Sequence, residues 1–251
     1  MNKIDLGLIK VSEVTQEFVI KEIQQNLLKS NVPNLIVTPN AGHLVSIENN
    51  KVLQDIYNNA ELCLIDGWPI ALAANIASKR KISRVAGSDL LPNLLKELPQ
   101  NIRIGIIGGK DQTKIREQLE NLFPNINLQL IDTSLWSDSV YDIRRLRELV
   151  QNNALSIVLL CLGHPKQEIL ANQLKNYDWV GARPDWILCV GASIDFLIGE
   201  QKRSPKIFSK LGLEWFYRLI TNPKKFFNRY LKAIWPSIKL ILNSFRMRKF
   251  N

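Results

Sequence analysis

The feature that most constrains the fold is a series of short, uninterrupted apolar runs. The clearest covers residues 156–162, and similar runs cover residues 35–37, 62–65 and 186–190. A strand of a parallel sheet is covered on both faces and is therefore apolar throughout, whereas a half-exposed strand alternates between apolar and polar residues. These runs consequently predict the buried strands of a mainly parallel sheet.

Helical patterns separate the runs, beginning with Val19, Ile23 and Leu27 at helical spacing. Two further strands are expected at residues 103–109 and 127–131. Helices are expected at residues 15–29, 41–48, 51–59, 69–78, 88–98, 111–122 and 140–151. The alternation predicts an α/β fold over residues 1–200, with a mainly parallel Rossmann-like sheet and helices on both of its faces.

Residues 201–251 differ in composition and are expected to form a basic, amphipathic, helical appendage. From Lys202 onward the chain has 13 lysines and arginines against one acid, Glu214, within a whole chain of net charge +10. An aromatic and aliphatic stripe accompanies the basic residues, and Pro236 is expected to kink or break the helix. The pattern fits a helix that lies in a membrane interface, and it equally fits a helix packed on the core with its charges in water.

Composition narrows the classes of function. The three cysteines, Cys63, Cys161 and Cys189, lie in apolar runs without metal-binding spacing, which predicts buried free thiols. The two histidines, His43 and His164, give little support to a catalytic triad or a zinc site, and no Asp-x-Asp pair is present for a sugar-nucleotide metal. No apolar run approaches the roughly 18 residues of a transmembrane helix, and the N-terminal segment does not resemble a signal peptide, so we expect a cytoplasmic protein.

Polar side chains follow the apolar runs at several points. Thr38 and Asn40 come after the first run, Asp66 follows the second, and Arg84 precedes a glycine. Ligands of open α/β sheets bind at the carboxyl ends of the strands, so these side chains are candidates for one crevice. Asp66 is either the cap of the next helix or a general base whose pKa is raised by partial burial. Thr38 and Asn40 are either turn and cap residues or hydrogen-bond partners of a sugar.

Two glycine turns are candidates for binding an anion. Gly108 and Gly109 end an expected strand before a helix, as in a phosphate-binding turn, although the spacing is not the full GxGxxG. A second turn precedes Gln167 and Glu168, which are expected in the first turn of a helix. The first turn leaves open a dinucleotide-dependent oxidoreductase, for which Asp132 is the available acidic residue.

Seven ordered segments resemble one family. They read TPNAGHLV, LIDGWP, RVAGSD, IGIIGG, LGHPKQE, VGASIDFLIGE and KRSPKIFSKLGLEWFYRLITNPKKF, and the match runs from about residue 34 to residue 229. In this order and spacing the chain resembles the WecG/TagA/CpsF glycosyltransferase family. The resemblance implies an inverting transfer of a sugar from a UDP-sugar to a polyprenyl-diphosphate-linked sugar in cell-surface polysaccharide synthesis. The best-known donor sugar is N-acetylmannosamine or its uronic acid, and another hexose or uronic acid is the alternative.

The resemblance also implies the setting of the reaction. It implies an enzyme that needs neither metal nor cofactor and that acts at the inner face of the cell membrane as a peripheral protein. The expected partners are the UDP-sugar, the lipid-linked acceptor, an anionic membrane surface and possible further copies of the chain. No nucleic acid is expected, because aromatic residues beside the basic ones favour a membrane.

Site residues are carried over position by position. Asp66 matches the proposed general base and Thr38 the threonine beside it, while Asn40, Arg84 and Gln167 match other pocket positions. In the appendage, which is expected to close over the pocket as a lid, Arg218 matches the first of the arginines that hold the donor diphosphate. Lys225 stands at the next, Arg229 adjoins the third, and Arg203 is a further candidate. The rival to all of these assignments is a membrane-binding module without catalytic activity.

Overall fold

The computed structural model describes residues 2–27, 29, 31–131, 143–201, 204–205, 208 and 214–249, without the side chains of Glu214, Arg218 and Lys225. The chain divides into two compact units. The first contains Met1–Thr15, Thr38–Ala86 and Lys202–Asn251, and the second contains Gln16–Val37 and Gly87–Gln201. The boundary expected at residue 201 stays a prediction, and the C-terminal segment groups with the two N-terminal segments of the first unit.

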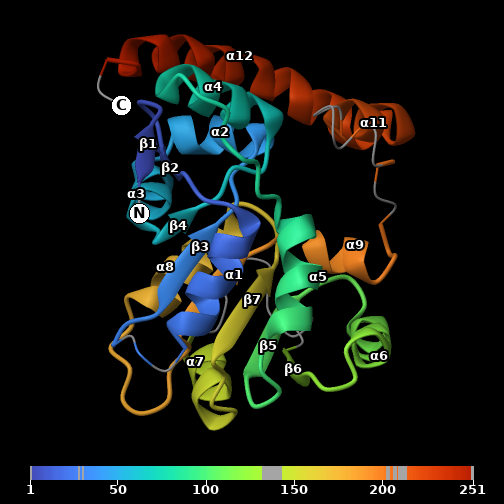
Figure 1. Cartoon of the computed structure of the whole chain (residues 1–251). Coiled ribbons are helices and arrows are strands. Elements are labelled where there is room, and N and C mark those ends of the chain that lie inside the picture. Colours follow the sequence, from blue (N-terminus) through green and yellow to red (C-terminus); the bar gives the residue numbers. More distant parts are fainter. Residues whose placement is uncertain are drawn as a thin grey trace. The chain divides into compact units, whose positions relative to one another are not determined.

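The second unit holds five of the six strands of the main sheet. In spatial order these are β3 (Asn34–Val37), β8 (Trp186–Cys189), β7 (Ile157–Cys161), β5 (Arg103–Gly108) and β6 (Asn127–Ile131). Every pair among these neighbours is parallel (Figure 1). All four residues of β8 are buried, as expected for a strand covered on both faces. The α/β fold with a parallel sheet is therefore confirmed.

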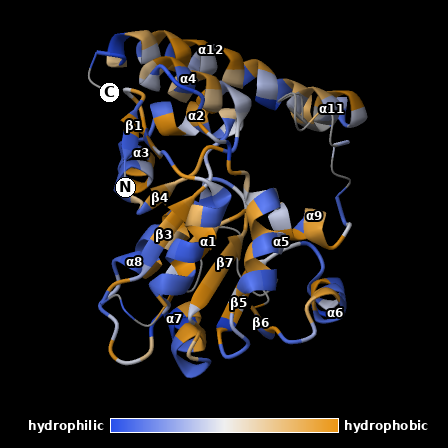
Figure 2. Cartoon of the chain, viewed as in Figure 1, coloured by the Kyte–Doolittle hydropathy of each residue, from blue (hydrophilic) through white to orange (hydrophobic). Residues whose placement is uncertain are grey.

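Helices of the second unit surround these strands. They are α1 (Gln16–Gln25), α5 (Gly87–Glu97), α6 (Gln112–Leu122), α7 (Ile143–Asn152), α8 (Lys166–Lys175) and α9 (Ser193–Leu197). Helix α8 packs against β3, β7 and β8, whereas α1 packs against α5 and α5 against α9. Leu170, Ala171 and Leu174 are the buried apolar residues of α8, and β3 and β7, which α8 covers, are mainly hydrophobic (Figure 2).

The first unit begins with a hairpin that the apolar runs did not predict. Strands β1 (Lys3–Asp5) and β2 (Lys10–Ser12) pair antiparallel, and Gly7 takes a positive φ of 83° in the turn between them. Strand β4 (Leu62–Cys63), the sixth strand of the main sheet, is shorter than the apolar run that predicted it. The run continues as a buried segment, where Val85 N donates a hydrogen bond to Ile65 O at 2.9 Å.

Three helices of the first unit agree with the sequence to within a residue. They are α2 (Ala41–Glu48), α3 (Lys51–Asn59) and α4 (Trp68–Ser78). Asn40 caps α2 and Asn50 caps α3, each accepting a backbone N–H with its side-chain oxygen. Such caps satisfy N–H groups that lack a partner inside the helix, and Asn40 was a capping candidate from the sequence.

The appendage forms α11 (Glu214–Thr221) and α12 (Pro223–Met247), and α12 packs on α4 and α2 (Figure 1). Pro236 was expected to kink or break the helix; it does not break it, because α12 continues through this residue, and a kink stays a prediction. Packing holds the helix on both sides of it: Ala233 is buried before it, and after it Lys239 forms an ion pair with Glu48 of α2. In the described part of the chain, no helix has both the length and the apolar character that crossing a bilayer requires.

Candidate functional site

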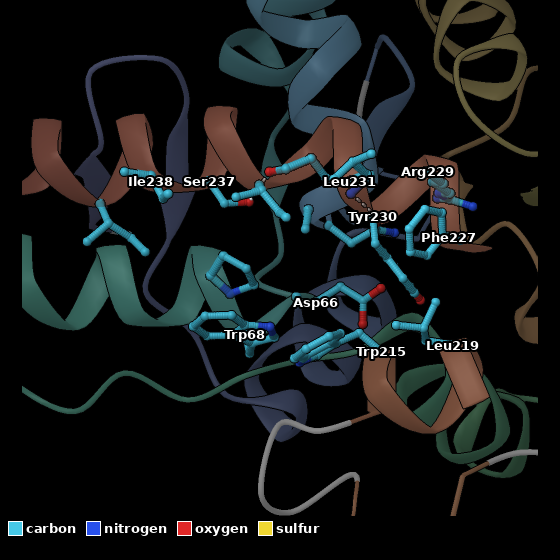
Figure 3. Close-up of a pocket in the computed structure, with 18 of the residues that line it drawn as sticks. Asp66, Trp68, Trp215, Leu219, Phe227, Arg229, Tyr230, Leu231, Ser237 and Ile238 are labelled. Carbon is cyan, nitrogen blue, oxygen red and sulfur yellow. Dashed lines mark hydrogen bonds between the residues drawn. The ribbon is translucent and has the colours of Figure 1, made fainter. Parts of the chain in front are cut away.

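A pocket of about 370 Å³ opens within the first unit (Figure 3). Its polar end is formed by Asn40, Asp66, Arg84 and Arg229. The remainder is lined by aromatic and aliphatic side chains of α4, α11 and α12. Concave sites of this size, largely apolar with a few convergent polar groups, are the usual form of small-molecule sites.

Asp66 is held at the polar end by the buried segment that follows β4. Its side chain is half-buried and lines the pocket, while the four residues before it are fully buried. The N-cap of α4 is Gly67, which has no side chain to cap with. Asp66 therefore precedes the capping position, and its carboxylate faces the pocket among Trp68, Trp215 and Tyr230 (Figure 3).

The absence of a side chain at Gly67 lets two loops approach each other closely. A Cβ at this position would lie 3.1 Å from Asn40 Cα and 3.2 Å from Ala41 N, both of them backbone atoms. Asn40 is thereby placed beside Asp66, and its Oδ1 accepts a hydrogen bond from Gly42 N at 3.0 Å. Asn40 is both the cap of α2 and a wall of the pocket, so the two readings of this residue from the sequence are compatible.

A buried histidine fixes the other end of the Asn40 amide. Asn40 Nδ2 lies 3.2 Å from His43 Nε2, and His43 Nδ1 lies 3.0 Å from the Tyr57 hydroxyl. Because the Asn40 oxygen already accepts from Gly42, its Nδ2 is the donor, and His43 Nε2 must be the acceptor. His43 is then the neutral tautomer protonated at Nδ1. No local pattern in the sequence indicates this role, since the three residues lie on two helices and a loop.

Two guanidinium groups give the polar end a positive character. Arg84 enters from the segment before α5, and Arg229 enters from α12. A Cβ at Gly42 would lie 2.4 Å from Arg229 Nε, so the arginine rests against the first turn of α2 where only a glycine leaves room. The N-terminus of α2, where Ala41 and Gly42 line the pocket, adds the partial positive charge of the helix dipole. This arrangement suits a ligand that carries negative charge.

Aromatic rings join α4, α11 and α12 around the carboxylate. The Trp68 and Trp215 ring centroids are 6.5 Å apart, and Trp215 meets Tyr230 edge-on at 6.1 Å. Tyr230 in turn stacks on Phe226 at 5.6 Å. These rings exclude water from part of the pocket and provide flat surfaces for a sugar or a base. Trp68 and Tyr230 were not among the expected site residues, because nothing local in the sequence marks a ring as part of a pocket.

One other expected residue of the first unit lies outside the described pocket, and the side chains of three more are not described. Thr38 is buried, with 6% of its surface exposed, and is not among the residues that line the described pocket. Arg218 lies in α11 and Lys225 in α12, but neither side chain is described, and Arg203 lies outside the described residues. Their roles stay predictions.

In the second unit, Gln167 is immobilised by its neighbours. Only 2% of its surface is exposed, its Oε1 accepts from Gly191 N at 3.0 Å, and its Nε2 donates to Glu168 Oε1 at 3.0 Å. Glu168 Oε2 lies 3.1 Å from His164 Nδ1. These hydrogen bonds hold the Gln167 amide in one orientation in the first turn of α8. Its role in binding substrate stays a prediction.

The glycine turn after β5 is packed within its own unit. Gly108 and Gly109 have φ angles of 92° and 91°, and a Cβ on Gly108 would lie 2.8 Å from Cys161 O. The next residue, Lys110, donates its N–H to the buried carboxylate of Asp195 at 3.3 Å. These contacts explain why glycines are needed here, and the phosphate-binding role of the turn stays a prediction.

The fold and the pocket define the class as an α/β protein with a parallel sheet and an electropositive, aromatic-lined site around one carboxylate. A model of the glycosyl transferase WecG/TagA/CpsF family matches residues 4–251, nearly the whole chain, and the chain belongs to that family. The resemblance read from the seven segments is confirmed. Family membership identifies a transferase and disfavours the oxidoreductase reading of the glycine turn.

Proposed function

We propose that this glycosyltransferase moves a sugar, N-acetylmannosamine or a related hexose or uronic acid, from a UDP-sugar to a polyprenyl-diphosphate-linked sugar. The observation that carries the proposal is the grouping of Asp66 with Asn40, Arg84 and Arg229 in one pocket. A carboxylate beside cationic groups suits a reaction in which one hydroxyl loses a proton while a diphosphate departs with negative charge.

Asp66 acts as the general base in this proposal. It accepts the proton of the acceptor hydroxyl as that oxygen attacks the anomeric carbon of the donor. The bond between the anomeric carbon and the diphosphate oxygen breaks, and its electron pair leaves with UDP. One in-line displacement inverts the configuration at the anomeric carbon. Thr38 and Asn40 support the acceptor side of this arrangement, in line with the family resemblance.

Cationic side chains stabilise the departing UDP. Arg84 and Arg229 line the pocket, and guanidinium groups bind phosphate oxygens in pairs of hydrogen bonds. Arg203, Arg218 and Lys225 join them in the closed enzyme in this proposal. These charges take the place of a divalent metal, so no metal or other cofactor is required. Gln167, Gly108 and Gly109 lie in the second unit, and a part for them in donor binding stays a prediction.

The appendage attaches the enzyme to the inner face of the cell membrane in this proposal. On α12, Trp235, Leu242 and Phe245 are exposed, and Lys239 and Arg246 are exposed on the same helix. Apolar side chains beside lysines and arginines favour the interface of an anionic bilayer, where the acceptor lipid is found. Figure 2 shows this mixture of polar and apolar residues along α12.

The proposal is tested by measuring turnover of a panel of UDP-sugars with a prenyl-diphosphate-GlcNAc acceptor, with and without a chelator. We expect turnover of at least one donor, unchanged by the chelator, and inversion at the anomeric carbon by NMR. Arg229→Ala should lower turnover strongly. Arg116→Ala is the matched control, since Arg116 is exposed and pairs with Glu120 on α6. Equal turnover in the two variants would remove Arg229 from the site.

A further inference from the structure

A chain of hydrogen bonds runs from the wall of the pocket into the core of the first unit. Asn40 lines the pocket, whereas His43 and Tyr57 are buried, with 5% and 0% of their surfaces exposed, and are not among its lining residues. The first link joins Asn40 Nδ2 to His43 Nε2 at 3.2 Å, and the second joins His43 Nδ1 to the Tyr57 hydroxyl at 3.0 Å. His43 lies in the first turn of α2 and Tyr57 lies in α3, so the chain connects the pocket to the packing of two helices.

The orientation of the Asn40 amide depends on these hydrogen bonds. The oxygen and the nitrogen of an amide have nearly the same size, so packing alone does not decide which way the group points. Gly42 N donates to Oδ1 at 3.0 Å and selects the oxygen for one end. His43 selects the nitrogen for the other end, provided that its Nε2 carries no proton. The nitrogen has two hydrogens, of which His43 accepts one, and a ligand in the pocket can accept the second.

Tyr57 supports this orientation from the far side of the imidazole ring. Its hydroxyl accepts the Nδ1 proton of His43, so the tautomer with a bare Nε2 has an acceptor for its proton and a donor for its lone pair. With the proton on Nε2 instead, two donors would face each other between His43 and Asn40. A buried donor that loses its acceptor costs free energy, so the tautomer and the amide orientation stabilise each other.

We propose that His43 and Tyr57 are positioning residues of the sugar transfer, which hold the Asn40 amide so that its nitrogen donates to a hydroxyl oxygen of the acceptor sugar. The proposal rests on the proposed function, in which Asp66 accepts the proton of the attacking hydroxyl. Gly67 has no side chain and lets Asn40 lie close to the loop that carries Asp66. A fixed N–H group binds a hydroxyl oxygen and a carboxylate binds a hydroxyl proton, so the two groups together orient a sugar.

Two substitutions of His43 separate its hydrogen bonds to Asn40 and to Tyr57. The side-chain amide of His43→Gln reaches the place of Nε2, so its oxygen still accepts from Asn40 while the contact with Tyr57 is lost. The shorter amide of His43→Asn reaches the place of Nδ1, so it still donates to Tyr57 while the contact with Asn40 is lost. Each variant loses one buried hydrogen bond, so a role in folding alone predicts similar effects for both.

The test measures steady-state turnover of the full chain with a UDP-sugar that the wild-type protein uses and a prenyl-diphosphate-GlcNAc acceptor. We expect His43→Asn to lower kcat/KM for the acceptor about tenfold, the loss expected for one hydrogen bond, and to leave the KM for the UDP-sugar unchanged. His43→Gln should stay within about threefold of wild type. In an Asn40→Ala background, His43→Asn should cause no further loss, because its effect passes through Asn40. Equal losses in the two His43 variants, or a further loss in the Asn40→Ala background, would overturn the proposal.

Tyr57→Phe is a milder variant that changes no atom in contact with Asn40. It removes the acceptor of the His43 Nδ1 proton, so it should lower kcat/KM for the acceptor severalfold and have no effect in the Asn40→Ala background. Thermal unfolding shows whether each variant keeps its fold, and Tyr57→Phe decides the question if a His43 variant does not. Full acceptor kcat/KM in Tyr57→Phe and in His43→Asn would assign both side chains to the core alone.

NMR of the imidazole nitrogens gives a readout that needs no turnover. The chain has two histidines, so the ring signals that vanish in His43→Gln belong to His43. At neutral pH we expect its proton on Nδ1 and a bare Nε2, and a proton on Nε2 would overturn the proposal. If no UDP-sugar is turned over, the proposed function fails, and the nitrogen signals still decide whether His43 holds the Asn40 amide. Turnover that is equal in all the variants overturns this proposal alone.

Discussion

The guanidinium of Arg229 on α12 rests directly against Gly42 in the first turn of α2, where a Cβ would lie 2.4 Å from Nε. Helix α12 thereby contacts the wall of the pocket, and a Cβ at position 42 would require the flexible guanidinium to shift. Gly42 is helical, so alanine at this position costs nothing in helix propensity and gains up to about 1 kcal/mol. Stability and ligand binding should therefore respond in opposite directions to one substitution.

Gly42→Ala should displace the Arg229 guanidinium and weaken UDP binding about tenfold, which is the range expected for the loss of a hydrogen bond to a charged group. Calorimetric titration with UDP measures this effect, and thermal unfolding should show no loss of stability. The double variant with Arg229→Ala should bind UDP no more weakly than Arg229→Ala alone. Additive losses would show that Gly42 acts in another way.

His43→Leu should destabilise the protein by about 1–3 kcal/mol. The change removes the hydrogen-bonding partner that His43 provides for the buried Tyr57 hydroxyl and for Asn40 Nδ2. Denaturant unfolding measures the loss. Tyr57→Phe removes the hydroxyl, so the double variant should be more stable than the sum of the two single losses predicts. If the stability losses of the two single variants simply add in the double variant, the hydrogen bond between His43 and Tyr57 is contradicted.

Buried thiols should make the protein less stable at alkaline pH. Burial raises the pKa of the Cys63 thiol from 9.0 to about 12. Between these values the unfolded chain has lost the thiol proton that the folded chain keeps, so stability falls as pH rises, by about 1.4 kcal/mol per unit for one such group. When the free energy of unfolding is measured from pH 9 upward, it should fall less steeply in Cys63→Ala, by about 1.4 kcal/mol per pH unit. An identical pH dependence of the unfolding free energy in the two proteins would contradict the raised pKa of the Cys63 thiol.

Removing the outward apolar residues of α12 should weaken membrane binding without unfolding the protein. Trp235 is 67% exposed and Leu242 is 57% exposed, so Trp235→Ser with Leu242→Ser changes little inside the fold. Sedimentation with anionic vesicles measures the partition coefficient of the protein between vesicles and buffer, which should fall tenfold or more in the double variant. The control replaces Val180, which is 83% exposed in the second unit, with serine. Equal binding by the two proteins would exclude α12 as the attachment.

Local signals in the sequence predicted most of the helices and strands. The features that were not predicted depend on short elements or on packing between residues far apart in the sequence. Asn40 could be proposed as a cap from the sequence, and it caps α2, because capping is a local interaction. The β1–β2 hairpin has strands of three residues each, too short for a period to be visible. Pro236 was expected to kink or break α12, and the break does not occur in a helix that packs on α4 and α2, which the sequence does not show.

The same distinction applies to the candidate site. Asp66, Asn40 and Arg84 could be proposed because each follows or precedes an apolar run, and all three line the pocket. The aromatic wall could not be proposed, because Trp68 and Tyr230 meet around Trp215 only when α11 and α12 fold back onto α4. The positions of His43 and Gly42 likewise acquire meaning only from their neighbours in space.

The central claim is that Asp66 is the base of a sugar transfer, and a single-turnover measurement of Asp66→Asn tests it most directly. With a donor that the wild-type protein uses, the rate of the chemical step should fall by about 10²–10⁴-fold, while UDP affinity and thermal stability stay close to wild type. Asp55→Asn, on the exposed face of α3, is the matched control and should react normally. A rate for Asp66→Asn within a few-fold of wild type would contradict the account.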